Sequence, residues 1–364
     1  MFACIGIGQG GSMICDKFAE YGIPTAIINY SQSDLSACVH VENKLLLQGS
    51  EGVGRDRSLA AEQMSNNYET AISFIKEHFS QPSTELIFII FSTGGGTGSG
   101  ITPIISELLM NEMDKTLVLC PIIPDTTESI NSQLNSLNTL AEISNLECAI
   151  APIDNQNVFT LGIGKNQLYN AVNSKFVHSI ISLIEYTERN TAFGNIDRND
   201  ILRLFETKGF LNISHIDISN LSNGVSLEPS YINKAIQESW SNNIFTSPCF
   251  DQVIRTGLIF DGQESLMSLI QPKEIFSSFT TQPLDVFEGW YTGEKGKVFT
   301  ILTGMKFNPT RLQQIKDIVE SQSQSIQNVL SADVSIPVST ISFQTKSKTQ
   351  KKKSLSDILN KYKK

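Results

Sequence analysis

Apolar and polar positions follow two different periods in the first half of the chain. Short, nearly continuous apolar runs predict five buried strands, at Phe2–Ile7, Thr25–Asn29, Leu86–Phe91, Thr116–Ile123 and Cys148–Ile153. Between them, apolar residues recur every three or four positions, which predicts helices over 10–21, 55–79, 101–113 and 127–145. This alternation predicts an α/β fold with a doubly wound, mostly parallel sheet of the Rossmann-like kind.

The pattern changes in the second half. A long helical period predicts a central helix, and its apolar face carries Val172, Phe176, Ile180, Leu183 and Ile184. Beyond it we expect strands near Val253–Phe260 and Val298–Thr303, a helix over Thr310–Leu330 and a last strand over Val334–Phe343. The chain therefore divides into an α/β domain (1–165), the central helix (166–190), a smaller α+β domain (191–343) and a tail (344–364).

Composition narrows the class of protein. The 364 residues are 40% hydrophobic, which is ordinary for a soluble globular protein, and no run reaches the roughly 18 apolar residues of a membrane span. The chain opens directly into a strand, so we expect no signal peptide. Six cysteines without a CxxC pair and four scattered histidines argue against a zinc site and indicate small buried side chains in a cytoplasmic protein.

Charge is distributed unevenly along the chain. Residues 346–364 contain eight lysines and one aspartate, a charge of +7, so the formal net charge of −9 leaves −16 for the rest. An acidic body of this kind is a poor nucleic-acid binder by itself. The tail is polar and basic, and we expect it to be flexible.

The run Gly94-Gly95-Gly96-Thr97-Gly98-Ser99-Gly100 carries the clearest chemical signal. It lies between a predicted buried strand and a predicted helix. Glycines allow backbone N–H groups to approach a ligand closely, and a helix N-terminus adds its positive end, so the run suits a phosphate chain. It lacks the Gly-Lys-Ser/Thr ending of a P-loop, and the phosphate cradle is therefore of another type.

A second glycine-rich turn, Gly6–Ser12, follows the first strand. Alone it fits the GxGxxG fingerprint of dinucleotide-binding enzymes, and an NAD-dependent oxidoreductase is one alternative for the whole chain. A dinucleotide site also needs an acid at the end of the second strand, where this chain has Asn29, with Asp34 a little further on. These residues fit the nucleotide site of another class of protein better than they fit a dinucleotide site.

Five further segments complete the set of candidate site residues. They are Gly49–Arg55, Pro124–Glu128, Ile153–Gln156, Tyr169–Asn173 and Asn195–Asp200. Tyr169 and Asn173 are four residues apart and share one helix face. An amide both donates and accepts hydrogen bonds, as the edge of a nucleobase does. Asp125 or Thr127 could equally be a plain helix N-cap, and the acids near Asp197 could lie in a solvated turn.

The heptapeptide Gly94–Gly100 is the signature of the tubulin superfamily, which includes tubulin, FtsZ and TubZ, and the weaker motifs occur in that family's order. The resemblance implies a GTP-binding domain over residues 1–165 and an activation domain over 191–343. It also implies that GTP or GDP with Mg²⁺ is bound by Gly8, Gln9, Gly10, Gly11, Ser12, Asn29, Gly52, Gly54, Gly94, Gly95, Gly96, Thr97, Gly98, Ser99, Glu128, Asn155, Tyr169 and Asn173. Within that set, Gln9 lies near the magnesium, Glu128 faces the ribose, and the last three residues recognise guanine.

Asp197 and Asp200 match the family's Asn-x-Asp-x-x-Asp pattern, which implies that they are catalytic. Two carboxylates would repel a triphosphate bound by the same subunit. Facing the nucleotide of the next subunit, they could instead orient the attacking water and help to hold the cation. The resemblance therefore implies head-to-tail filaments in which polymerisation activates GTP hydrolysis.

The last residues favour one branch of the family. Ser132 stands where FtsZ has an arginine, and the basic end differs from the apolar peptide of FtsZ and the acidic tail of tubulin. It resembles TubZ, a family that segregates plasmid or phage DNA through a DNA-binding adaptor on centromere-like repeats. The alternatives are a division-scaffold GTPase of the FtsZ type and a tail that only aids solubility.

Overall fold

The computed structural model describes residues 1–158, 165–221, 228–293 and 296–331. Two compact units divide the chain at Ser323. The strand expected over Val334–Phe343 and the basic tail lie outside the described residues. The domain boundaries expected at residues 165, 190 and 343 stay a prediction.

One sheet runs through the first unit, in the order β10-β9-β11-β8-β6-β5-β4-β1-β2-β3, with β7 paired to β5. The strands are β1 (Phe2–Ile7), β2 (Thr25–Asn29), β3 (Asn43–Leu46), β4 (Leu86–Ser92), β5 (Thr116–Ile123), β6 (Ala149–Ile150), β7 (Ile153–Asp154), β8 (Gly209–Asp217), β9 (Arg255–Gly262), β10 (Asp285–Thr292) and β11 (Lys297–Met305). All neighbours are parallel except that β11 is antiparallel to β8 and β9. The expected α/β class with a mostly parallel sheet is confirmed.

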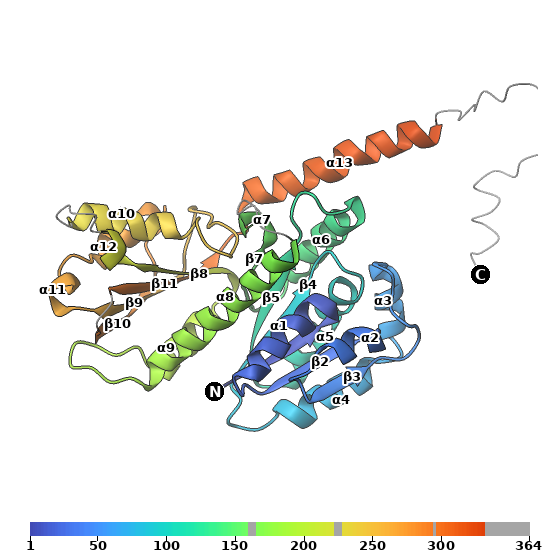
Figure 1. Ribbon diagram of the computed structural model, residues 1–364, viewed down its shortest axis with the longest axis horizontal. Coiled ribbons are helices and arrows are strands. Elements are labelled where there is room, and N and C mark those ends of the chain that lie inside the picture. Colours follow the sequence, from blue (N-terminus) through green and yellow to red (C-terminus); the bar gives the residue numbers. More distant parts are fainter. Residues whose placement is uncertain (159–164, 222–227, 294–295, 332–364) are drawn as a thin grey trace, which may run out of the picture. The chain divides into compact units, whose positions relative to one another are not determined.

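The helices connect these strands and cover both faces of the sheet (Figure 1). They are α1 (Gly8–Glu20), α2 (Gln32–Ala37), α3 (Arg57–Met64), α4 (Tyr68–Phe79), α5 (Thr97–Glu112), α6 (Ile130–Ile143), α7 (Asn155–Val158), α8 (Lys165–Glu185), α9 (Arg198–Glu206), α10 (Pro229–Ser239), α11 (Glu264–Met267), α12 (Pro272–Ile275) and α13 (Pro309–Ser331). Three 3₁₀ turns follow α8, β8 and α12, at Tyr186–Glu188, Ile218–Leu221 and Phe276–Ser278.

Two predicted helices differ from the observed ones. The helix expected over 55–79 is two helices, because the side chain of Asn67 turns inward and exchanges hydrogen bonds with the backbone of Gln48 at 2.9 Å in both directions. The helix expected from residue 101 begins at Thr97 instead. Its first turn therefore includes Gly98 and Gly100, so the helix N-terminus lies within the glycine-rich run itself.

Each face of the sheet has its own core. In β1, Ala3, Ile5 and Ile7 face one core, while Phe2 and Cys4 face the other. The long helix α8 lies between the β1–β6 part of the sheet and the β8–β11 part (Figure 1). It packs on α1 through Phe176, whose ring meets Phe18 edge-on at 6.0 Å.

The cysteines are structural, as the sequence indicated. All six are free thiols and all are buried. Burial raises the pKa of the Cys38 thiol to about 11 and that of the Cys148 thiol to about 12. Neither group therefore forms a reactive thiolate at neutral pH.

A close approach between α1 and β4 depends on Gly11. A Cβ atom at Gly11 would lie 1.9 Å from the backbone oxygen of Ile90, which no side chain can relieve. We predict that Gly11→Ala lowers the free energy of unfolding by about 3 kcal/mol or more, because the helix must move off the strand. Urea unfolding followed by circular dichroism measures the loss.

Gly95→Ala is the matched control for that substitution. A Cβ atom at Gly95 meets nothing within 4 Å, so the same chemical change should alter stability by no more than about 0.5 kcal/mol. Equal stability of the two variants would contradict the assignment of Gly11 to packing.

Candidate functional site

A cavity of about 840 Å³ opens at the carboxyl ends of β1, β2, β4 and β5. Fifteen of the residues expected to bind nucleotide line it, and they are Gly8, Gln9, Gly10, Asn29, Gly52, Gly54, Gly94, Gly95, Gly96, Thr97, Gly98, Glu128, Asn155, Tyr169 and Asn173. Gly11, Ser12 and Ser99 are not among the lining residues, and the last two are fully buried. Segments that are up to 165 residues apart in the sequence thus converge on one space.

The floor of the cavity is formed by two helix N-termini. Helix α1 begins at Gly8, whose φ is +70°, and α5 begins at Thr97. The two meet closely, since a Cβ atom at Gly8 would lie 3.0 Å from the backbone nitrogen of Gly98. Unpaired N–H groups and two positive helix ends therefore face the same space, an arrangement that binds phosphate.

A third loop, residues 49–56, packs over this floor. The N–H group of Gly52 donates to the carbonyl of Tyr30 at 3.1 Å. A Cβ atom at Gly96 would lie 2.6 Å from the side chain of Val53, so the loop rests directly on the signature run. The Asn135 amide on α6 donates to the carbonyls of Arg55, Gly94 and Gly95 at 3.0 to 3.4 Å, and one side chain holds both loops.

The other end of the cavity contains the residues expected to recognise the base and ribose. The Tyr169 hydroxyl donates to Glu128 at 3.5 Å, and Asn155 begins α7 directly after β7. The Gln156 side chain accepts a hydrogen bond from the N–H group of Thr126 at 2.9 Å. This bond joins residues 153–156, here called the base loop, to residues 124–128, here called the ribose loop, after the parts of the nucleotide that they are expected to bind. Ser129, rather than Asp125 or Thr127, caps α6, and Asp125 accepts from Thr127 within the loop before the helix.

A buried ion pair supports this end of the cavity, and no sequence motif indicates it. Arg311 near the start of α13 donates to both oxygens of Asp154, at 2.8 and 3.1 Å, and to the carbonyl of Pro124 at 2.7 Å. The two side chains are 7% and 1% exposed. Asp154 precedes Asn155, and Pro124 precedes the ribose loop, so one guanidinium fixes both segments.

The two acids expected to be catalytic, Asp197 and Asp200, do not line this cavity. Asp197 and Asp200 form a capping box at the start of α9, in which each carboxylate accepts the other's N–H group at 2.9 Å. Between them Arg198 forms an ion pair with Glu85, the residue before β4, whereas the signature run follows β4. A strand of seven residues spans about 23 Å, and these acids therefore lie at the opposite end of the sheet from the cavity.

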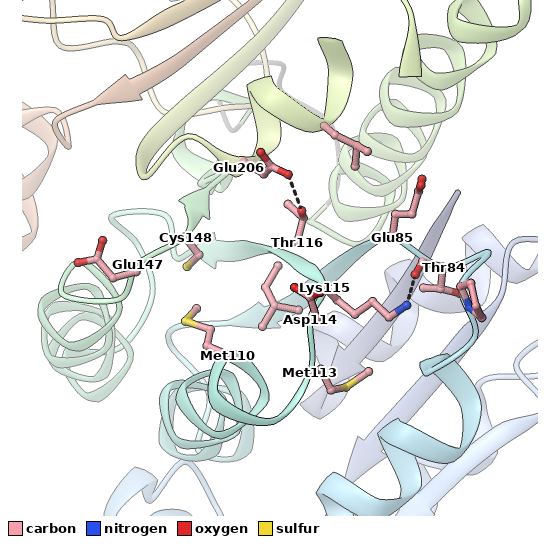
Figure 2. A pocket seen from close by; sticks show the side chains of 13 residues that line it. Thr84, Glu85, Met110, Met113, Asp114, Lys115, Thr116, Glu147, Cys148 and Glu206 are labelled. Carbon is pink, nitrogen blue, oxygen red and sulfur yellow. Dashed lines mark hydrogen bonds between the residues drawn. The ribbon is translucent and has the colours of Figure 1, made fainter. Parts of the chain in front are cut away.

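A second cavity of about 600 Å³ opens at that opposite end, at the amino ends of β4 and β5 (Figure 2). Helix α9 contributes Leu202 and Glu206 to its wall, and Glu206 accepts a hydrogen bond from Thr116 at 3.4 Å. Lys115 donates to the carbonyl of Thr84 at 2.6 Å (Figure 2). None of the residues expected to bind nucleotide lines this second cavity.

Among the described residues, two kinds of feature are absent. There, no group of three or more His, Cys, Asp or Glu side chains is placed to hold a metal ion. In the same part of the chain, no helix has the length and apolar character needed to cross a membrane.

Replacing Arg311 by leucine should destabilise the protein by about 3–5 kcal/mol, because it leaves the Asp154 carboxylate buried without a partner. Chemical unfolding measures the loss. The control is Lys76→Met, which breaks the exposed pair with Glu112 and should cost no more than about 1 kcal/mol. If the two variants lost equal stability, the buried pair would not have the structural role assigned to it.

The chain resembles known proteins in sequence. Residues 2–162 match the family model described as the Tubulin/FtsZ family, GTPase domain. The chain is similar to the tubulin-like protein CetZ of Thermococcus kodakarensis, with 25% identity over 97% of this chain and 91% of that protein. It is also 25% identical to the tubulin-like protein TubZ of the Clostridium botulinum C phage, over 89% of this chain and 84% of the phage protein.

A solved structure extends the likeness to the whole fold. The GTPγS-form protofilament of Bacillus thuringiensis serovar israelensis TubZ superimposes with a TM-score of 0.76 at 16% identity, covering 90% of this chain and 93% of that one. At this identity the likeness concerns the fold alone. The match over residues 2–162 shows a GTPase domain of the Tubulin/FtsZ type, and over most of its length the chain is similar to the tubulin-like proteins CetZ and TubZ.

Proposed function

We propose that the protein polymerises head to tail and hydrolyses GTP at the junction between subunits. The observation that carries this proposal is the separation of two sets of residues by the length of β4. The phosphate cradle lies at one end of the sheet, and Asp197 and Asp200 lie at the other. One subunit therefore has an incomplete site, and stacking copies in the same direction brings the two ends together.

The cavity residues have distinct parts in binding the nucleotide. The N–H groups around Gly8–Gly10 and Gly94–Gly98 hold the phosphates at the two helix ends, and the Gly52–Gly54 loop closes over the terminal phosphate. Glu128 binds the ribose, and the last three residues (Asn155, Tyr169 and Asn173) bind guanine. Their common place in one cavity supports these assignments.

Magnesium fits the chemistry of this cavity. Mg²⁺ in nucleotide sites is usually held by phosphate oxygens, waters and one or two protein groups rather than by an acidic cage. The lining agrees with that preference, since Gln9 supplies an amide oxygen at the cradle. The ion would neutralise charge on the phosphates.

Hydrolysis requires a water molecule positioned in line with the bond to the terminal phosphate. In the proposed junction, a carboxylate of the neighbouring subunit orients that water and accepts its proton as the phosphate transfers. The capping box holds both acids at a helix N-terminus with fixed direction. Loss of the terminal phosphate then removes contacts at the junction and weakens it.

Asp200→Asn tests the catalytic assignment without disturbing the helix. Asp200 is the third residue of the capping box, and the side-chain oxygen of asparagine also accepts hydrogen bonds, so the bond from the N–H group of Asp197 can persist. We expect the variant to bind GTP and to polymerise, while its turnover per subunit falls by about a hundredfold or more. Phosphate release and sedimentation measure the two properties, and Asp251→Asn, at an exposed site, serves as the control.

Two outcomes would contradict this proposal. Normal turnover by the Asp200→Asn filament would remove the acid from the reaction. A wild-type rate per subunit that does not depend on protein concentration would show that one subunit contains the whole active site.

A finer proposal concerns the cargo of the filament. We propose that it moves plasmid or phage DNA, with the lysine-rich tail binding a DNA-bound adaptor. The charge of +7 over residues 346–364, on an otherwise acidic chain, supports this role. The CetZ relatives are as similar as the TubZ relative, so a filament with a different cargo, or a division scaffold, is the competing function.

Deleting residues 346–364 separates these cargo functions. The truncated protein should keep its GTPase activity and its filaments, because the cavity and the acids lie outside the deletion. The test uses any small helix-turn-helix protein whose gene adjoins this one, bound to its DNA repeats, and the truncated protein should lose co-sedimentation with it. Unchanged co-sedimentation, or none with the full chain, would rule out the adaptor role of the tail.

A further inference from the structure

Arg55 is the single cationic residue among the described residues that line the nucleotide cavity. The other charged lining residues are Asp34 and Glu128, which are both acids. A nucleoside triphosphate carries several negative charges, so Arg55 is the charged side chain of this lining that attracts the ligand, whereas Asp34 and Glu128 repel it. The position of Arg55 along the cavity therefore determines which part of the ligand it can bind.

Arg55 lies at the phosphate end. Its backbone packs against the start of α5, because a Cβ atom at Gly96 would lie 3.0 Å from the Arg55 Cα atom. The residues that face the base, Asn155 and Tyr169, belong to different elements. The guanidinium is thus within side-chain reach of phosphates that rest on the Gly94–Gly98 amides.

The backbone of Arg55 is held in an unusual conformation. Its φ of +67° is the one positive value at a non-glycine residue in the described part of the chain. The amide of Asn135 secures it by donating to the Arg55 carbonyl at 3.0 Å, together with the carbonyls of Gly94 and Gly95. Strain of this kind persists where the surrounding structure fixes it, which is common at ligand-binding loops.

The guanidinium itself has weak partners. Its Nη1 atom donates to the hydroxyls of Ser129 and Ser132, at 3.0 and 3.4 Å. Over the described ranges Arg55 makes no ion pair. A phosphate oxygen accepts a stronger, charge-assisted hydrogen bond than a neutral hydroxyl does, so a bound phosphate would displace these serines.

We infer that Arg55 distinguishes GTP from GDP, by transferring its guanidinium from Ser129 and Ser132 to the γ-phosphate. This assignment rests on the function proposed for the cavity. When the γ-phosphate leaves, the guanidinium returns to the two serines at the start of α6. The loop of residues 49–56 and helix α6 therefore change their mutual contacts with the state of the nucleotide.

Competition binding with GTPγS and GDP, at protein concentrations below those that polymerise, tests the inference. Arg55→Gln should weaken GTPγS binding about tenfold or more, and should change GDP binding less than about twofold. Arg55→Lys should keep part of the preference, because it retains the charge without the planar fork. Arg203→Gln, an exposed change on α9 outside the cavity, is the control for loss of an arginine.

The variant Arg55→Gly distinguishes loss of the side chain from rearrangement of the loop. Glycine adopts a positive φ without strain, so this variant removes the side chain and preserves the backbone. It should show the same selective loss of GTPγS. Equal weakening of both nucleotides, or no change in either, would overturn the assignment of Arg55 while the proposed GTPase function stands. Failure of the wild-type protein to bind either nucleotide would overturn both.

Discussion

The close contact between the first turns of α1 and α5 is the constraint on which the nucleotide cavity depends. Strands β1 and β4 are neighbours, so the helices that follow them begin side by side. Only glycine permits the separation observed there, with Gly98 against the backbone of Ser92 and Gly8 against Gly98. Two positive helix ends and a set of free N–H groups then face one space. The loop of residues 49–56 and the ribose loop both pack on that floor.

The same parallel sheet separates the two sets of candidate site residues. All strands from β3 to β6 run in one direction, so their carboxyl ends gather the glycine-rich loops at one edge. Helix α9 starts at the other edge, where Arg198 pairs with Glu85. The capping box of Asp197 and Asp200 stabilises that helix and also fixes the direction of the two carboxylates. A local helix cap and a catalytic contact across a junction are compatible roles for the same side chains.

Two side chains that are far apart in the sequence fix the loops of the cavity relative to one another. Asn135 joins the signature run to the loop before α3, and Arg311 joins the base loop to the ribose loop. Neither residue has a local sequence signal, since an asparagine within a helix and an arginine near a helix start are common. Their importance comes from burial and from partners 40 to 187 residues away. Sequence patterns therefore do not predict the roles of Asn135 and Arg311.

The sequence by itself determined the α/β class, the buried strands and the glycine-rich turns, because these depend on the spacing of apolar residues and on local backbone freedom. It also indicated the family, since the Gly94–Gly100 run encodes a strand, a tight turn and a helix start within a few residues. Only the tertiary structure decided that Gly11 serves helix packing, that α13 supports the segment after β7 through Arg311, and that Asp197 and Asp200 lie a strand's length away from the Gly94–Gly100 run. Those features depend on contacts between residues that are distant in the sequence. The spacing of residue types along the chain does not reveal such contacts.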